Sequence, residues 1–175
     1  MIQEYSELNS WHNQKDPWQY ENTEDDIKRK NILLSEIPQK KYENVLDIGC
    51  GQGFITESLP GTNIFGVDIS TNAIKYAKQK EHDHLTFLEG SIFDIDKVVA
   101  NKFDLIIITG VLYQQYIGQS TNLVYLLIDK ILNKGGVLIS VHIDDWYYSQ
   151  FPYIRAKELF YQYRTYNHKL EIYYK

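Results

Sequence analysis

The sequence predicts a doubly wound α/β domain built on a mostly parallel sheet. Short runs rich in Ile, Leu and Val alternate with helix-length segments, and the first run ends in a cluster of three glycines. Strands buried on both faces of a sheet are typically apolar at nearly every position. Two strand-like segments with no helix between them close the chain, which indicates an antiparallel pair at one sheet edge.

The predicted parallel strands share this apolar composition and are separated by about 15 to 30 residues, enough for a helical crossover each. They cover residues 45–48, 63–67, 85–89, 104–108 and 137–143. In the closing pair, YQYRTY and KLEIYY are the predicted strands, and we place the turn between them at Asn167 and His168.

Helices are expected between and before the strands. Residues 20–36 form a charged helix ahead of the first strand, with Ile27 and residues 32–34 as its inner face. A second helix is predicted to begin near Phe54, directly after the glycines.

Two later helices have clearer boundaries. Residues 71–80 form one of them, with Ser70 or Thr71 as its cap. Residues 120–132 place apolar side chains at helical spacing, and the turn residues 133–136 are predicted to end that helix.

Length and composition limit the function. A chain of 175 residues predicts one domain with a short extension, which we divide into a helical extension or lid at 1–40 and a binding core at 41–175. The net charge of -5 and the absence of a basic block argue against a nucleic-acid partner. The sequence leaves a homodimer open.

One cysteine excludes an internal disulfide and any cysteine-based metal cage, and a lone cysteine fits a reducing compartment. The first residues lack the apolar segment of a secretory signal, and no apolar run reaches the about 20 residues of a membrane span. We therefore expect a cytoplasmic protein without a membrane span.

The glycine cluster indicates a ligand lying against the main chain. Gly49, Gly51 and Gly53 end the first strand with spacing G-x-G-x-G, and Phe54 stands where a dinucleotide fingerprint would carry its third glycine. Asp47 precedes them on the same strand. A carboxylate there repels a pyrophosphate but attracts an ammonium or sulfonium group, which favours S-adenosylmethionine.

Two further strand ends carry carboxylates. Asp68 can accept both hydroxyls of a ribose, although it can also cap the following helix. After the third strand, Ser91 is followed by Asp94, which can accept the amine of adenine while Phe93 or Ile95 flanks the ring; Asp94 as a plain helix cap is the alternative.

Together these segments resemble class I S-adenosylmethionine-dependent methyltransferases. The resemblance covers residues of about 40 to 142 and rests on VLDIGCGQG, GVDIS, GSIFD, FDLIIITGVLYQ and LNKGGVLIS, in that order. It implies a Rossmann-like, seven-stranded sheet with an antiparallel last strand, and a cofactor whose methionine arm lies over the three glycines. It also implies that Ile69 packs on the adenine and that Thr109, at the end of the fourth strand, borders the cofactor.

The segment DPWQYENTEDDIKRK, residues 16–30, and the tail TYNHKLEIYYK resemble nodulation-type methyltransferases, which act on the amine of an aminosugar oligosaccharide. The aromatic side chains ahead of the first strand are candidates for a lid over the cofactor, since aromatic faces suit sugars and exclude water. Trp11 and Trp18 are the main candidates; packing of Trp18 on the sheet is the alternative.

Methyl transfer requires no metal, but an amine or hydroxyl acceptor needs a base. Strands four and five end beside the expected methyl group. His142 is the first choice because its ordinary pKa lies near working pH, with Tyr113 as a weaker catalytic candidate and a structural role for His142 as the alternative. Tyr116, Asp144 and His12 are weaker candidates for contact with the acceptor, whereas His82, His84 and His168 are expected on surface turns.

The sequence thus predicts a methyltransferase acting on the nitrogen or oxygen of a small acceptor, such as a sugar or surface-glycan precursor. One alternative is an inactive partner subunit that binds the cofactor. Another is a nicotinamide-dependent oxidoreductase, which the glycine spacing and Asp47 disfavour.

Overall fold

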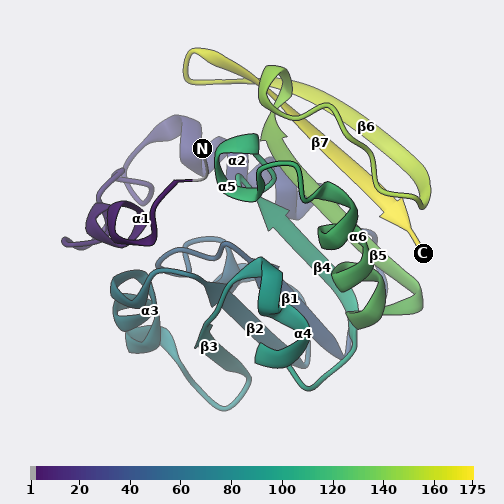
Figure 1. Ribbon diagram of the computed structural model, residues 1–175, viewed down its shortest axis with the longest axis horizontal. Helices are drawn as coiled ribbons and strands as arrows, with labels where there is room; N and C mark the ends of the chain where they lie inside the picture. The colour runs from purple at the N-terminus through teal and green to yellow at the C-terminus, as the bar shows by residue number, and fades with distance from the viewer. Residues whose placement is uncertain (1–2) are drawn as a thin grey trace.

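The computed structural model describes residues 3–175 and contains a seven-stranded sheet flanked by helices on both faces (Figure 1). The strand order is β3-β2-β1-β4-β5-β7-β6. The strands are β1 Asn44–Ile48, β2 Asn63–Asp68, β3 Leu85–Glu89, β4 Phe103–Thr109, β5 Leu132–Ile143, β6 Ile154–Tyr163 and β7 Tyr166–Tyr174.

Strands β1 to β5 pair in parallel, and β7 lies antiparallel between β5 and β6. The order reverses at β1, where β2 pairs on one side and β4 on the other. Parallel sheets bind ligands at this switch point, beyond the carboxyl ends of the strands. The doubly wound, mostly parallel fold with an antiparallel strand near one edge is therefore confirmed.

The helices cover two hydrophobic layers. Leu46 and Ile48 of β1 face the layer under α4 and α6, while Val45 faces the layer under α2 and α3. This alternation along each strand buries both sheet faces, which explains the continuous apolar runs in the sequence. The helices are α1 Tyr5–Trp11, α2 Glu24–Glu36, α3 Thr71–Ala77, α4 Ile95–Val98, α5 Gln114–Ile117 and α6 Thr121–Ile131.

The predicted helix near Phe54 is wrong. The chain leaves the glycines through turns and a single 3₁₀ turn at Thr56–Ser58. The helix expected at 71–80 ends at Ala77 and continues as a 3₁₀ turn, but its predicted cap is correct, because the Ser70 hydroxyl accepts a hydrogen bond from the Ala73 amide at 3.1 Å.

The predicted inner face of α2 is correct in part, because Leu33 is fully buried and Ile32 and Leu34 pack against the core. Ile27 is 42% exposed, and the buried side chains of α2 are Asp26, Arg29 and Leu33. Two of these three are charged, so apolar periodicity alone could not identify the whole inner face.

The C-terminal hairpin turns three residues earlier than predicted. Arg164 and Thr165 form the turn, and Asn167 and His168 lie within β7. His168 is buried at 4% exposure, so its expected place on a surface turn is wrong. Strand β5 also starts at Leu132, so residues 133–136 belong to the strand and do not form the predicted turn.

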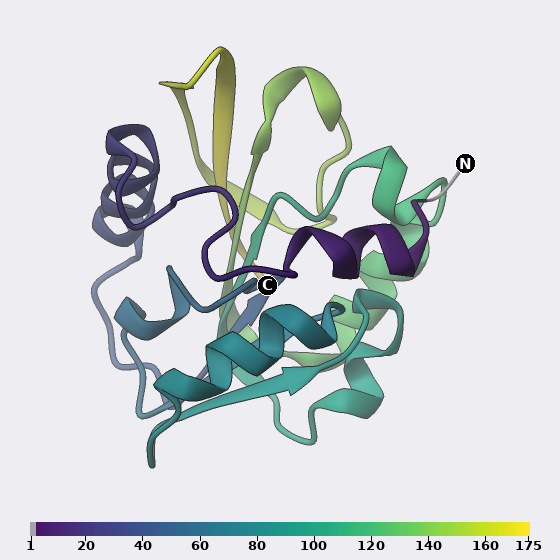
Figure 2. The ribbon, with the colours of Figure 1, turned by 90° about the vertical axis from the view of Figure 1, so that its left-hand side faces the viewer.

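The N-terminal segment lies across the carboxyl ends of the strands. Helix α1 runs beside α3 (Figure 2), and Asn9 joins them because its side-chain oxygen accepts from the Ser70 hydroxyl at 2.9 Å and the Asn72 amide at 3.0 Å. Within the described residues, no helix is long and apolar enough to cross a bilayer.

Candidate active site

A cavity of about 630 Å³ lies between the N-terminal segment and the carboxyl ends of β1, β2, β3 and β4. Its size is within the usual range for small-molecule sites. The floor comes from the strand ends, and the walls come from α1, α2, α5 and the segment that joins α1 to α2.

The glycine turn forms the floor of the cavity. Gly49 has φ +77°, and a Cβ there would lie 2.2 Å from Cγ2 of Val111. The amides of Gly49 and Cys50 donate to the Val67 carbonyl at 2.8 and 3.1 Å, which holds the turn against β2. Gly49 and Gly51 both line the cavity, so a ligand meets bare main chain there.

Gly53 has another role from the one predicted. It does not line the cavity, and a Cβ at Gly53 would lie 2.7 Å from the ring of Phe87. A glycine is required at this position because the backbone φ is +82° and because a side chain would overlap Phe87 of β3. It is not required for contact with a ligand.

Asp47 lines the cavity at the end of β1 and is 2% exposed. One carboxylate oxygen accepts a hydrogen bond from the Thr56 hydroxyl at 2.7 Å. Burial raises the pKa of Asp47 to about 6, because no neighbouring cation offsets the loss of solvent fully. A positively charged ligand group beside Asp47 would favour the ionised carboxylate and lower its pKa again.

Asp68 lines the same cavity at the end of β2. Its two carboxylate oxygens accept hydrogen bonds from the Gly51 and Ser70 amides, each at 2.8 Å. These bonds fix the carboxylate, and burial raises its pKa despite them. Because the Ser70 hydroxyl caps α3, Asp68 is not needed for that purpose, and its remaining lone pairs are free for a ligand.

The segment after β3 contributes Ser91 and Phe93 to the cavity, and Ile69 after β2 lies in its wall. Asp94 does not line the cavity. Its carboxylate instead forms an exposed ion pair with Lys97 at 2.9 Å, so the predicted contact with adenine is not supported by its position.

The predicted lid residues meet the cavity. His12 is 7% exposed, and its ring centroid lies 4.8 Å from that of Trp18. Trp18 stacks on Tyr20 at 5.4 Å, and Tyr20 stacks on Phe54 at 5.8 Å. Trp11 packs edge-on against Trp18, with ring centroids 6.1 Å apart, and both rings line the cavity.

Of the candidates at the ends of β4 and β5, Thr109 and Tyr116 line the cavity, whereas Tyr113 and Asp144 do not. The Tyr113 hydroxyl accepts from the Ile143 amide at 2.9 Å, and burial raises its pKa to about 12. Asp144 faces Lys169 at 3.4 Å.

His142 is not at the cavity either. Its side chain is 1% exposed and packs edge-on against Tyr147, with ring centroids 4.7 Å apart. Burial, with Lys169 and His168 nearby, lowers the pKa of His142 to about 3. This position corrects the sequence-based choice of His142 as the base, since a base must reach the acceptor.

Sequence reasoning missed Arg29. This α2 side chain lines the cavity at 8% exposure. The available signal was the spacing of Asp26 and Arg29, which places two opposite charges on one helix face.

A family profile described as a methyltransferase domain matches residues 39–171, which is most of the chain. The chain belongs to the S-adenosylmethionine-dependent methyltransferase family. The predicted membership of this family is therefore confirmed, and S-adenosylmethionine is the cofactor that the family uses.

The chain is also similar in sequence to other methyltransferases. The chain is 33% identical to a malonyl-[acyl-carrier protein] O-methyltransferase of Bacillus cytotoxicus over 69% of this chain and 43% of that protein. It is 29% identical to the Acetivibrio thermocellus protein of the same name over 83% of this chain and 49% of that protein. The chain thus spans about half the length of these methyltransferases.

Among solved structures, the N-methyltransferase NodS from Bradyrhizobium japonicum WM9, in complex with S-adenosyl-L-homocysteine, superposes with a TM-score of 0.85. The alignment covers 98% of this chain and 97% of that chain at 21% identity. This methyltransferase therefore shares its fold with NodS over nearly its whole length.

Proposed function

We propose that this protein transfers a methyl group from S-adenosylmethionine to the nitrogen or oxygen of a small acceptor. The observation that carries the proposal is the convergence of Asp47 and Asp68 on one cavity floored by Gly49 and Gly51. Two carboxylates and a bare main-chain turn suit a ligand with a cationic arm and a ribose.

The chemical groups that line the cavity suit the different parts of S-adenosylmethionine. Asp47 faces the ammonium group, and Asp68, already fixed by the Gly51 and Ser70 amides, accepts the ribose hydroxyls. Ile69 and Phe93 supply apolar surface for the adenine. Thr109 borders the cavity with a buried hydroxyl that has no partner among residues 3–175, so it is available to a bound ligand.

When bound, S-adenosylmethionine supplies a methyl group activated by its sulfonium. The chain's own contribution is to position the acceptor in line with the transferred methyl and to exclude water. His12, Trp11 and Trp18 line the cavity from the N-terminal segment, which supports a role in excluding water for the extension predicted as a lid at 1–40.

For the acceptor we propose a sugar or a glycan precursor with an amine or hydroxyl group. Trp11 and Trp18 line the cavity and offer aromatic surface suited to a sugar ring. The likeness to NodS, an N-methyltransferase, makes nitrogen the first choice, while the malonyl-[acyl-carrier protein] O-methyltransferases make oxygen the second.

Calorimetry with S-adenosylhomocysteine and with NADH tests the proposal. We expect binding of the former and none of the latter, and a loss of about 100-fold in affinity for Asp68→Ala, because two hydrogen bonds to a charged group are removed. Asp94→Ala is the matched control and should bind normally. An Asp68→Ala variant that binds as tightly as the parent protein would refute the assignment.

Turnover separates an active enzyme from an inactive partner subunit. A panel of aminosugars, neutral sugars and acyl thioesters is incubated with S-adenosylmethionine, and release of S-adenosylhomocysteine is measured. Acceptor-dependent release supports the methyltransferase. Tight cofactor binding without release from any acceptor would favour the partner-subunit alternative.

A further inference from the structure

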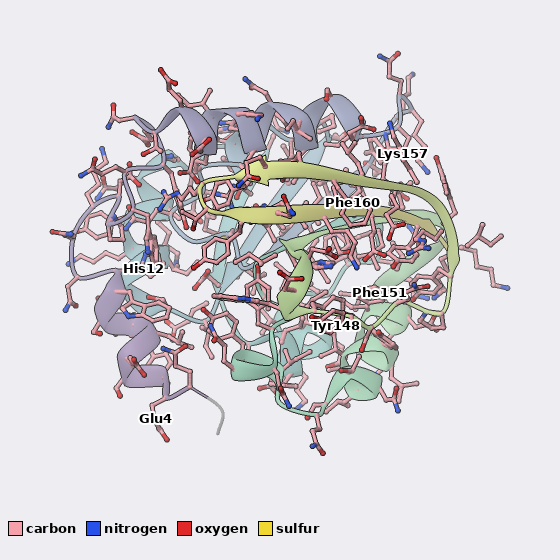
Figure 3. All side chains as sticks on the ribbon, turned by 90° about the horizontal axis from the view of Figure 1, so that it is seen from above. Glu4, His12, Tyr148, Phe151, Lys157 and Phe160 are labelled. Atoms are coloured by element: carbon pink, nitrogen blue, oxygen red, sulfur yellow. The ribbon has the colours of Figure 1, made fainter. Side chains whose placement is uncertain are left out.

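The outer strand β6 forms a long open edge of the sheet. The strand order ends at β6, which pairs with β7 on one side, and no other strand within residues 3–175 pairs with its outer side. Figure 3 looks onto this edge, where the hairpin of β6 and β7 lies in front of the sheet. The opposite edge, β3, has 5 residues, whereas β6 has 10. Open main chain of this length is a template for a further strand.

The first half of β6 has features that protect an edge from pairing. A bulge interrupts its register with β7 between Arg155 and Lys157. Both side chains are cations. Arg155 forms ion pairs with Glu158 and Glu171, and Lys157 forms one with a glutamate of α2. Bulges and charged side chains, lysine above all, are the usual means by which sheets block pairing at an edge.

The second half of β6, residues 159–163, lacks these features. Its sequence LFYQY has no charged residue and no proline, and it pairs with β7 in a regular register. Phe160 is 53% exposed there, although it is a large apolar side chain. A segment of high strand propensity and low charge favours association when it lies on an open edge.

Symmetry limits how two β6 strands can pair antiparallel. Directly opposed side chains lie on the same face of a sheet, so a two-fold axis between identical strands places one residue opposite its own copy. A centre at Lys157 or Glu158 would bring like charges together. A centre at Leu159 would place the exposed Phe160 ring opposite Glu158. These three registers are therefore unfavourable.

A centre at Phe160 suits the pairs on the exposed face. The two Phe160 rings oppose each other, and aromatic pairs across strands stabilise a sheet. Glu158 then lies opposite Gln162. The Gln162 amide donates to the Arg164 carbonyl at 2.8 Å, and its second N–H is available to the opposed carboxylate. Residues 157–163 of each copy are paired in this register.

We propose that β6 is a self-association surface, through which two copies of this chain pair antiparallel about Phe160 and form one continuous sheet. The paired segment is short beside the about 20 to 30 residues that each partner contributes to a standard interface, so the dissociation constant should be about 1 to 100 µM. Other segments line the cavity. The dimer therefore does not depend on the proposed function.

Sedimentation of the full chain over a range of protein concentrations tests the surface. The parent protein should change from monomer to dimer as the concentration rises. Phe160→Lys should remain monomeric, because it places two cations opposite each other at the centre of the pair. Leu126→Lys is the matched control: it adds the same charge at a 69% exposed apolar residue of α6 and should dimerise as the parent does. Thermal unfolding checks that each variant is folded.

Cross-linking tests the register. Cβ atoms of directly opposed residues lie about 4.5–5.5 Å apart, so Phe160→Cys should form a disulfide-linked dimer under mild oxidation. Gln162→Cys, also at an exposed position, is the control. Because Gln162 lies opposite position 158, its two copies are about 13 Å apart along the strands, too far for a disulfide. The native Cys50 is buried and should not react.

Three outcomes would overturn the proposal. A parent protein that stays monomeric at every concentration would leave the edge to a strand of another protein. A dimer that persists in Phe160→Lys would place the interface on another surface. Linkage of Gln162→Cys without linkage of Phe160→Cys would refute the pairing about Phe160.

Discussion

Nε2 of His142 lies 3.8 Å from a carboxylate oxygen of Glu171, and neither side chain is more than 1% exposed. Arg155 neutralises Glu171 through a contact of 3.0 Å, so this carboxylate does not need a protonated histidine as its partner. The loss of solvent around His142 therefore outweighs its attraction to Glu171. Burial keeps the imidazole neutral and lowers its pKa to about 3. This histidine belongs to the interior of the sheet and not to the active site.

The first prediction concerns acid stability. His142 and His168 both have pKa values lowered to about 3, chiefly by burial, while both titrate near 6.5 in the unfolded chain. The unfolded state therefore takes up protons first as the pH falls. The contribution of the two histidines to the free energy of unfolding should decline from about pH 6.5 toward pH 3, by up to about 1.4 kcal/mol per pH unit for each, whereas the raised pKa values of Asp47 and Asp68 change stability in the opposite sense.

Urea unfolding at several pH values measures this slope. His142→Gln and His168→Gln should each reduce it, whereas His82→Gln, on the exposed surface, should leave it unchanged. Histidine variants with the same pH dependence of stability as the parent protein would contradict the prediction.

The second prediction concerns turnover. Because His142 lies outside the cavity, His142→Gln should keep kcat within about threefold of the parent value, well below the 100-fold or greater loss expected for a general base. Measurement at pH 7.5, where the fold is stable, separates catalysis from stability. A loss of about 100-fold with intact cofactor binding would restore His142 as a catalytic candidate.

The third prediction concerns the charge of Asp47. Burial raises its pKa to about 6, so the carboxylate becomes neutral as the pH falls through that value. Its attraction for the ammonium of S-adenosylmethionine should then disappear, and affinity should drop between about pH 7 and pH 5. Calorimetry across this range should show the drop in the parent protein and a flat, weaker profile in Asp47→Asn.

The fourth prediction concerns closure of the lid. The Asn9 side chain accepts hydrogen bonds from Asn72 of α3 and from Ser70, which caps that helix, and its loss should favour the open lid by about tenfold or more. Stopped-flow measurement should detect a correspondingly faster release of S-adenosylhomocysteine from Asn9→Ala. Ser6→Ala, on the exposed face of α1, is the control; equal release rates for the two variants would argue against a lid.

The fifth prediction concerns the glycine turn. Gly49→Ala introduces a Cβ that overlaps Cγ2 of Val111 at a positive φ, so it should destabilise the fold by about 1–3 kcal/mol and weaken cofactor binding. Val111→Ala in the same chain removes the overlap but not the backbone strain. The double variant should recover part of the stability in thermal unfolding, and no recovery would contradict the steric cause.

Much of the fold could be predicted because buried parallel strands are apolar without alternation, and all five predicted strands are present. The predicted position of the hairpin turn was wrong because the residues of the turn are not typical turn residues. Arg164 adopts φ +52° without glycine or proline beside it, and such a turn has no signal in the sequence. The buried charges of α2 were missed because their partners lie about 138 residues away.

Some residues of the candidate site could likewise be predicted from the sequence, and others could not. Asp47, Gly49, Gly51 and Asp68 could be predicted because strand ends in a parallel sheet meet at one edge. His142 also ends a strand, but nothing local shows that Tyr147 and Glu171 would enclose it. Arg29 could not be predicted, because its place at the cavity depends on packing of α2 against Tyr20 and against Tyr163 of the distant hairpin.

The hairpin turn has a consequence for synthesis on the ribosome. Arg164 donates to the carbonyl of Trp18, which is 146 positions earlier in the chain. The glycine turn and the lid leave the exit tunnel long before this partner is made. A nascent chain can therefore form the hydrogen bond between the hairpin turn and the N-terminal segment only after the last two strands have been made.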